Sequence, residues 1–231
     1  MKIALLGYGA MGRLVAAEAQ KAGDEMGHVV TTRNSANVDE LATQLQGHDV
    51  AIDFSVADVV LKHVEACATA QVPLVEGTTG WSDHDEARKL VEEHNSALVY
   101  GANFSIGMNV FYRVVQNAAE LFASVEQYAP FIEEAHHSRK RDAPSGTALR
   151  LRDFMTDRLG KDVPVSATRA GYIPGTHRVG FDSEADQILL THTARSRQGF
   201  ASGALWAAKW ISGRKGVFEF GEVIQSVVMR R

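Results

Sequence analysis

The chain has 231 residues, with a hydrophobic share of 45%, a charged share of 23% and a net charge of −4, which is typical of a soluble globular protein. The negative charge excludes a general attraction to nucleic acid or to an anionic membrane, so any anion site has to be local. Cys67 is the single cysteine, which excludes an internal disulfide and fits a reducing compartment. No apolar run reaches the roughly 18 residues of a membrane span. The first residues already have a strand pattern, so we expect no signal peptide and a cytoplasmic enzyme or binding protein.

The first half of the chain alternates short apolar runs with helical patterns. Strands are expected at 2–6, 28–32, 50–54, 72–75 and 97–100, and helices at 13–21, 57–70 and 83–94. Alternating strands and helices predict an α/β fold with a Rossmann-type, doubly wound parallel sheet. Right-handed crossovers would place the loops that follow the strands on one edge of that sheet.

The pattern changes after Phe104, where strands become more frequent than helices. Helices are expected at 109–122, 147–159 and 201–211, and strands at 128–134, 163–169, 177–181 and 187–194. The apolar stripe of the first of these helices is predicted to comprise Val110, Val114, Ala118 and Leu121. We predict a second, smaller α+β domain on an open mixed sheet at 105–197, and a dinucleotide-binding domain at 1–104 that 198–231 completes.

A glycine-rich loop, Gly7-Tyr8-Gly9-Ala10-Met11-Gly12, follows the first expected strand and precedes the first expected helix. Glycines allow a tight turn and let a pyrophosphate approach the helix N-terminus, where free N–H groups and the helix dipole favour anions. A glycine-rich packing turn is the alternative interpretation. Because the strand–loop–helix context is the required one, we predict that this loop binds a dinucleotide.

The end of the second expected strand bears on the choice of cofactor. An NAD-selective site usually has an acidic residue there, roughly 20 residues beyond the glycines. This chain has Thr32 and Arg33 instead, and the next acidic residue is Asp39. Arg33 suits a 2′-phosphate through charge-assisted hydrogen bonds, although it also fits a solvated loop. We predict NADPH as the preferred cofactor, with NADH as the second candidate.

Two further loops end the fourth and fifth expected strands, on the edge where ligands bind an open sheet. They comprise Gly77, Thr78 and Thr79 in one loop and Gly101, Ala102, Asn103 and Phe104 in the other. Small residues let backbone groups approach a nicotinamide and its ribose, whereas each loop alone would also fit an ordinary turn.

The stretch from Glu133 to Ala148 combines two histidines, a lysine and a Pro-Ser-Gly-Thr turn. His136 can give or take a proton near neutrality, because the ordinary histidine pKa is about 6.5. Ser145 suits a helix N-cap, and Gly146 and Thr147 after it would offer N–H groups to a carboxylate or phosphate. Asp142 would brace this loop. A core histidine is an alternative for His136 or His137, but Lys140 and the anion-binding turn argue against it for both.

A metal site is not expected in this stretch. Adjacent histidines point apart in an extended chain, and the sequence has neither a His-Glu-x-x-His spacing nor a supporting cysteine.

The stretch Glu134-Ala135-His136-His137-x-x-Lys140-x-Asp142-Ala143-Pro144-Ser145-Gly146-Thr147-Ala148 resembles the signature of the dihydrodipicolinate reductase family, also called 4-hydroxy-tetrahydrodipicolinate reductases. Other matching segments are the loop at 7–12, Asp53-Phe54-Ser55, Glu76-Gly77-Thr78-Thr79-Gly80, Asn103-Phe104-Ser105-Ile106-Gly107, Gly175-Thr176-His177-x-Val179-Gly180-Phe181 and Gly199-Phe200-Ala201-x-Gly203-Ala204. The resemblance thus covers nearly the whole chain.

The resemblance implies the reductase step of lysine and diaminopimelate biosynthesis, from 4-hydroxy-tetrahydrodipicolinate to 2,3,4,5-tetrahydrodipicolinate, by a homotetramer acting on a small dicarboxylate. It implies that His136 is the acid/base and that Lys140 donates a proton or acts electrostatically. His137 would bind substrate, and Ser145, Gly146 and Thr147 would hold a carboxylate. The cofactor would lie on residues 7–12, 77–79 and 101–104. Many family members carry an acid where this chain has Thr32 and Arg33.

Two alternatives stay open at the level of sequence. A related amino-acid dehydrogenase, such as an aspartate or diaminopimelate dehydrogenase, would share the nucleotide loop but not the His-His-x-x-Lys-x-Asp-Ala-Pro-Ser-Gly-Thr stretch. A non-catalytic NADPH-binding regulator would be expected to have lost its proton donors, whereas His136 and Lys140 are both present.

Overall fold

The computed structural model describes residues 1–31 and 37–228 and divides into two compact units. Unit 1 consists of residues 1–106 and 197–231, and unit 2 of residues 107–196. The sequence prediction placed these two boundaries after residues 104 and 197, whereas the units change after residues 106 and 196. Among the described helices, none is both long enough and apolar enough to cross a membrane.

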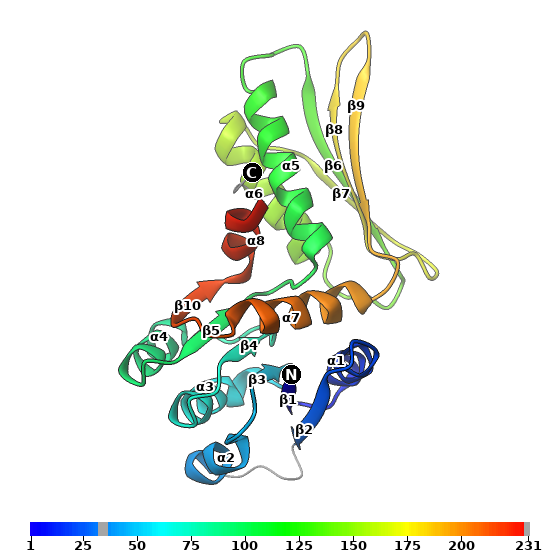
Figure 1. The fold of residues 1–231 in the computed structure, drawn as a ribbon. Coiled ribbons are helices and arrows are strands. Elements are labelled where there is room, and N and C mark those ends of the chain that lie inside the picture. Colours follow the sequence, from blue (N-terminus) through cyan, green and yellow to red (C-terminus); the bar gives the residue numbers. More distant parts are fainter. Residues whose placement is uncertain (32–36, 229–231) are drawn as a thin grey trace. The chain divides into compact units, whose positions relative to one another are not determined.

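Unit 1 is built on a six-stranded sheet (Figure 1). Its strands are β1 (Lys2–Leu6), β2 (Glu25–Val30), β3 (Val50–Asp53), β4 (Leu74–Glu76), β5 (Ala97–Tyr100) and β10 (Gly216–Glu219). They lie in the order β10-β5-β4-β3-β1-β2, and every neighbouring pair is parallel. The order reverses between β1 and β3, which is the point where open parallel sheets bind their ligands.

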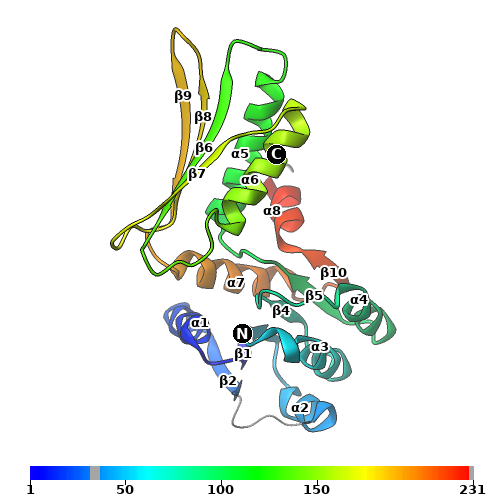
Figure 2. The same cartoon turned by 180° about the vertical axis from the view of Figure 1, so that it is seen from behind.

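Helices cover both faces of this sheet (Figures 1 and 2). The helices of unit 1 are α1 (Ala10–Lys21), α2 (Val38–Leu45), α3 (Val60–Thr69), α4 (His84–Glu93), α7 (Gln198–Ile211) and α8 (Phe220–Val228), and a 3-10 turn, η1 (Ala57–Val59), leads into α3. One core joins α2, α3 and α4 to strand residues such as Leu6 and Leu74. On the opposite face α7 packs against α1 and against β3, β4 and β5. The predicted doubly wound parallel sheet is therefore confirmed.

Three described elements of unit 1, namely α2, β10 and α8, were not predicted from the sequence, and β2 was displaced. Helix α2 is short, but it carries a recognisable start, because Asn37 and Glu40 form a capping box. Strand β10 has only four residues, and its pairing partner β5 lies far away in the sequence. Strand β2 was expected at 28–32 but begins at Glu25.

Unit 2 is built on a four-stranded mixed sheet. Its strands are β6 (Ala129–His136), β7 (Val165–Arg169), β8 (Thr176–Asp182) and β9 (Gln187–Thr193), in the order β7-β6-β8-β9. Strand β7 runs parallel to β6, whereas β8 is antiparallel to both β6 and β9. Two helices, α5 (Ile106–Phe122) and α6 (Gly146–Leu159), pack against the sheet and form the core of the unit with it. The predicted open mixed sheet is confirmed.

The predicted apolar stripe of α5 was wrong at Val114 and Leu121, although Ala118 packs against the core of unit 2. Val114 and Leu121 are 43% and 76% exposed. The buried positions of the helix are Met108, Asn109, Phe111, Tyr112, Val115 and Ala119. Both stripes have helical spacing, and the sheet takes the one with the larger aromatic side chains, which remove more apolar area from water.

Candidate active site

A cavity of about 630 Å³ opens in unit 1 at the carboxyl ends of the parallel strands. Eight residues predicted to bind the cofactor line it, namely Gly9, Ala10, Met11, Gly77, Thr78, Thr79, Ala102 and Phe104. They follow β1, β4 and β5, so three loops far apart in the sequence share one edge of the sheet. A cavity of this size, at the point where the strand order reverses, suits a nucleotide cofactor.

Gly7 and Gly12 act by shaping the loop rather than by lining the cavity. Gly7 has a φ of +91°, and a Cβ placed on it would lie 2.6 Å from the Phe54 carbonyl oxygen. A Cβ on Gly12 would overlap the carbonyl oxygen of Gly7. Neither position tolerates a side chain, because the turn between β1 and α1 is packed against itself and against the loop after β3.

The other residues predicted at the cofactor edge have different places. Tyr8 is exposed. Gly101 donates its N–H to the Glu76 carbonyl oxygen at 3.1 Å, and Asn103 Oδ1 accepts from the Ser105 N–H at 2.9 Å. Tyr8, Gly101 and Asn103 are not among the residues that line the cavity. Thr32 and Arg33 lie outside the described residues.

Six lining residues were missed by sequence reasoning. They are Phe54, Ser55, Val56, Ala57, Arg197 and Phe200. The first four follow β3, so the end of an expected strand was a usable signal. Arg197 and Phe200 lie at the start of α7, and nothing local in the sequence says that this helix returns to the cofactor edge. Arg197 adds a positive charge to the lining.

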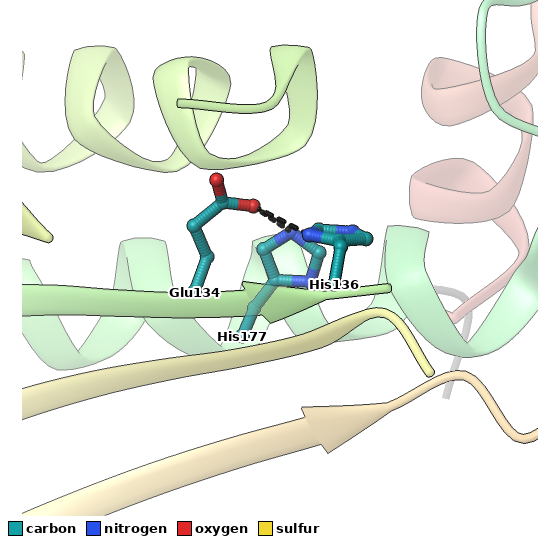
Figure 3. Close-up of side chains that lie close together, drawn as sticks. All are labelled: Glu134, His136 and His177. Carbon is teal, nitrogen blue, oxygen red and sulfur yellow. Dashed lines mark ion pairs between the residues drawn. The ribbon is translucent and has the colours of Figure 1, made fainter. Parts of the chain in front are cut away.

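In unit 2, three ionisable side chains meet at the end of β6 (Figure 3). His136 Nδ1 lies 2.8 Å from Glu134 Oε2, close enough for an ion pair but without the direction of a hydrogen bond. His177 Nε2 lies 3.8 Å from the same oxygen. The sheet register produces this meeting, since Glu134 on β6 is paired with His177 on β8.

Glu134 is held as a buried anion. Its Oε1 accepts hydrogen bonds from the Ser145 N–H at 3.0 Å and from the Arg169 guanidinium. Burial raises the pKa of Glu134, but the hydrogen bonds from Ser145 and Arg169 outweigh it, and the net pKa is below the ordinary value. Arg169 reaches this carboxylate from β7, where it is paired with His136.

The two histidines of the cluster differ in their electrostatics. Burial lowers the pKa of His136, Glu134 raises it, and Lys140 and Arg169 lower it, with a net decrease. Burial, with a contribution from His136, lowers the pKa of His177 to about 4, so this ring is neutral at neutral pH. His177 was not predicted as a site residue, although His136 was.

The residues predicted to hold substrate surround the start of α6. Ser145 is buried, and its Oγ accepts from the Ala148 N–H at 3.2 Å and lies 3.2 Å from His177 Nε2, so it caps the helix as expected. Gly146 is exposed, and the space where a Cβ would lie is open. Thr147 follows it in the first turn of the helix.

Lys140 and Asp142 form an ion pair of 2.8 Å beside this helix start. A hydrogen bond from Lys140 and, to a smaller extent, the N–H of Gly146 lower the pKa of Asp142. The Asp142 carboxylate therefore bridges Lys140 and the helix start, which agrees with a bracing role. His137 is half-buried, and its Nδ1 has no hydrogen-bond partner within the described part of the chain.

Glu134, His136 and His177 could also offer three metal-ligand atoms, which lie within 4.8 Å of one another. The Arg169 guanidinium already neutralises Glu134, and Lys140 adds a second positive charge to the field at His136. The positive charges of Arg169 and Lys140 would repel a cation, so the charges favour proton chemistry at this cluster.

Comparison with known proteins decides the family. A profile described as "Dihydrodipicolinate reductase, N-terminus" matches residues 1–104, and one described as "Dihydrodipicolinate reductase, C-terminus" matches residues 107–224. The chain belongs to the dihydrodipicolinate reductase family. As a member of this family the protein is an oxidoreductase that uses NAD(P)H.

Named relatives of the dihydrodipicolinate reductase family match over almost the full chain. The 4-hydroxy-tetrahydrodipicolinate reductase of Christiangramia forsetii is 38% identical, and the match covers 98% of this chain and 99% of the relative. The protein of the same name from Neisseria meningitidis is 32% identical, with 92% and 86% covered.

Solved structures agree with the fold of the family. A dipicolinate-bound dihydrodipicolinate reductase from Paenisporosarcina sp. TG-14 matches with a TM-score of 0.80 at 22% identity, covering 95% of this chain and 97% of that one. A C. glutamicum DAP dehydrogenase matches with a TM-score of 0.52 at 13% identity, covering 100% and 98%. At such identities the likeness concerns the fold alone, so the amino-acid dehydrogenase alternative has no support beyond architecture.

Proposed function

We propose that the protein reduces 4-hydroxy-tetrahydrodipicolinate, by way of dihydrodipicolinate, to 2,3,4,5-tetrahydrodipicolinate with NAD(P)H, in lysine and diaminopimelate biosynthesis. The names of its relatives and the two matching family profiles support this role. The observation that carries the proposal is the grouping of His136, Lys140 and the start of α6 around one loop of unit 2. The Paenisporosarcina reductase is bound to dipicolinate, which supports a small dicarboxylate substrate here.

His136 and Lys140 are proposed to manage the proton. A bound nicotinamide would supply hydride to the substrate, and the negative charge that then develops has to be stabilised and protonated. Burial and the neighbouring cations place the pKa of His136 below its ordinary value, while the buried Glu134 carboxylate opposes that shift and favours the charged form that donates a proton. Lys140 adds a cation beside it and can itself donate a proton.

The substrate carboxylate is proposed to bind at the start of α6. Gly146 and Thr147 would present N–H groups there, with Ser145 as the cap that orients them and His137 as a further contact. Asp142 now contacts both Lys140 and the N–H of Gly146, so a substrate carboxylate would compete with it for these donors.

The cofactor is proposed to lie in the unit 1 cavity. The small residues along its lining leave room for the dinucleotide, and the glycine loop after β1 leads into the N-terminus of α1, which suits the pyrophosphate. We propose a preference for NADPH, because Thr32 and Arg33 offer a hydroxyl and a guanidinium to the 2′-phosphate where an acid would select NAD.

We also propose a homotetramer and a cytoplasmic location. Ile188 and Leu189 on β9 are exposed apolar side chains of the unit 2 sheet, which association would cover. Free, buried Cys67 fits a reducing compartment.

Purified protein mixed with freshly made product of the preceding synthase should oxidise NADPH, followed by the loss of absorbance of the reduced nicotinamide. We expect kcat/KM to be roughly tenfold or more higher with NADPH than with NADH, the order of one charge-assisted hydrogen bond. Arg33→Ala should abolish most of this preference by raising KM for NADPH. Cofactor binding without turnover would instead support a regulator, and equal effects of Arg33→Ala on both cofactors would remove the NADPH assignment.

A further inference from the structure

Two buried carboxyl groups lie behind the cofactor cavity and have no part in the chemistry described so far. Asp53 ends β3 and Glu76 ends β4, and both side chains are 0% exposed. The two residues are paired in the parallel register, so their side chains project from the same face of the sheet. Each immediately precedes a loop that lines the cavity.

Both carboxyl groups bind the backbone of those loops. Asp53 Oδ1 accepts the Ser55 N–H at 2.8 Å, and Glu76 Oε1 accepts the Thr78 N–H at 2.6 Å. The Ser55 N–H also points to Thr78 Oγ1 at 3.0 Å, which ties the two loops together. Ser55 and Thr78 themselves line the cavity, so the carboxyl groups fix two parts of its wall from behind.

A third side chain anchors the pair to α3. His63 Nδ1 lies 2.6 Å from Asp53 Oδ2, and the ring is buried. The chain thus keeps two acids and a histidine in a position where apolar residues would pack without desolvation cost. Apolar replacements would leave the N–H groups of Ser55 and Thr78 without these acceptors, which gives the acids a reason to be buried.

The surroundings of Glu76 favour its protonated form, which would let the two acids lie side by side. Burial and the Asp53 carboxylate raise the pKa of Glu76 well above its ordinary value. Glu76 Oε2 has no N–H or O–H donor among the described residues, and a protonated Glu76 can instead donate to Asp53. The ionisable groups that interact with Glu76 are Asp53 on β3 and Cys67 on α3, whose thiol pKa is raised by burial and by both acids, while His63 contacts Asp53.

We propose that Asp53 and Glu76 are positioning residues for the nicotinamide dinucleotide, holding the loops at Ser55 and Thr78 in the conformation that the cofactor binds. The proposal rests on the proposed function, since it requires the cavity of unit 1 to be the cofactor site. Neither acid needs to touch the cofactor, because each acts through the backbone of its loop.

Two replacements of Glu76 of similar length test the role. Glu76→Gln keeps an acceptor for the Thr78 N–H and a donor for Asp53, whereas Glu76→Met removes both. We expect Glu76→Met to raise the Kd for NADPH and NADH roughly tenfold, the order of one buried hydrogen bond lost. The Kd of Glu76→Gln should stay close to that of the wild type, and kcat at saturating cofactor should change little in both variants.

Asp24→Asn is the matched control. The Asp24 side chain is only 7% exposed and pairs with the Met1 ammonium at 2.9 Å, away from the cavity lining. Asp24→Asn should lower the stability of the fold without changing the Kd for NADPH or for NADH. This result would separate a positioning role from general destabilisation. Titrations of intrinsic fluorescence or calorimetric heat supply the Kd values.

The outcomes separate the two proposals. A Glu76→Met protein that binds both cofactors like the wild type, or a Glu76→Gln protein that binds as weakly as Glu76→Met, overturns the positioning role alone. A wild-type protein that binds neither cofactor overturns the proposed function and this role with it.

A pH titration decides the matter if Glu76→Met does not fold. Ionising Glu76 would place two negative charges side by side and disturb the loops that the cofactor binds. The Kd of the wild type for the cofactor should therefore rise with increasing pH, whereas the Kd of Glu76→Gln should show no such rise. Stability has the same sign, since a raised pKa of an acid means that the folded state loses stability as the pH rises towards that value. Parallel curves for the two proteins refute the proposal.

Discussion

The proton chemistry proposed at the end of β6 depends on one buried carboxylate. Glu134 accepts the Ser145 N–H and the Arg169 guanidinium on one oxygen, and its other oxygen lies 2.8 Å from His136 Nδ1. Burial and the charges of Lys140 and Arg169 lower the pKa of His136, and the Glu134 carboxylate opposes them by raising it. The same carboxylate therefore fixes the start of α6 and tunes the proposed acid.

Glu134→Gln should move the pH dependence of the reaction. Without the negative charge the pKa of His136 falls further, so the limb of the pH–rate profile assigned to His136 should shift to lower pH. We also expect kcat to fall roughly tenfold or more, part of the 10²–10⁴ that a positioned acid contributes. Steady-state kinetics across the pH range measure both effects.

Glu133→Gln is the control for this replacement. Glu133 is the neighbour on β6, its side chain is 48% exposed, and it pairs with Arg178 at 3.5 Å. It should leave the profile unchanged, because an exposed ion pair contributes little. Superimposable profiles for wild type and Glu134→Gln would show that Glu134 does not tune His136.

Residue types alone led to the prediction of the histidine, the lysine and the helix start as parts of one site. His177 and Arg169 could not be recognised as their partners, because they lie on other strands. His177 on β8 is paired with Glu134, and Arg169 on β7 is paired with His136. A register is a long-range property, and a shift by one residue would turn these side chains to the other face.

At the level of elements, the edge proposed to bind the cofactor depends on a close approach of α7. A Cβ on Gly203, in the middle of this helix, would overlap the carbonyl oxygen of Phe104. Phe104 lines the cavity, so the helix and the loop after β5 have to be fitted together for the cavity to keep its wall.

Gly203→Ala should destabilise the protein. In an open helix this change usually stabilises by about 0.5–1 kcal/mol. Here the added methyl has no space, and overpacking should cost about 1–3 kcal/mol and weaken cofactor binding through Phe104. Chemical denaturation and a cofactor titration measure the two effects. Ser202→Ala, at the exposed neighbouring position, should be close to neutral, and a stabilised Gly203→Ala protein would contradict the packing argument.

Element types followed from periodicity, but the choice of a buried face did not. On α5 two stripes of apolar residues have helical spacing, and only the packing of unit 2 selects Phe111, Tyr112 and Val115 over Val114 and Leu121. Strand β10 has only four residues, too few for a clear periodic pattern, and it forms because its backbone pairs with β5.

At the level of the whole molecule, the two units differ in how the chain builds them. Unit 2 is continuous, and all members of its core cluster, from Met108 to Leu190, lie between 107 and 196. Unit 1 is discontinuous, since α7 and β10 come from the last part of the chain and pack against β3, β4 and β5.

A fragment of residues 106–196 should therefore fold by itself, whereas 1–105 should not. Without α7 and β10, the part of one face over β3, β4 and β5 and one edge of the parallel sheet would be exposed to water. Circular dichroism during thermal unfolding should show a cooperative transition for the first fragment only. Linking 197–231 directly to 1–105 should restore a cooperative transition, and a fragment 106–196 without one would contradict the independence of its core.

The sequence by itself determined the alternation of strands and helices, the change of pattern after Phe104, the glycine loop and the stretch from Glu134 to Ala148 that is proposed to react, because each is a local pattern. Only the tertiary structure decided that Arg197 and Phe200 line the cavity proposed to hold the cofactor. It also decided that Asp53 meets Glu76, and that Glu134 meets Arg169 and His177. Strand pairing and helix packing bring together residues that are distant in the chain, and their energies depend on burial and on register, which no local pattern specifies.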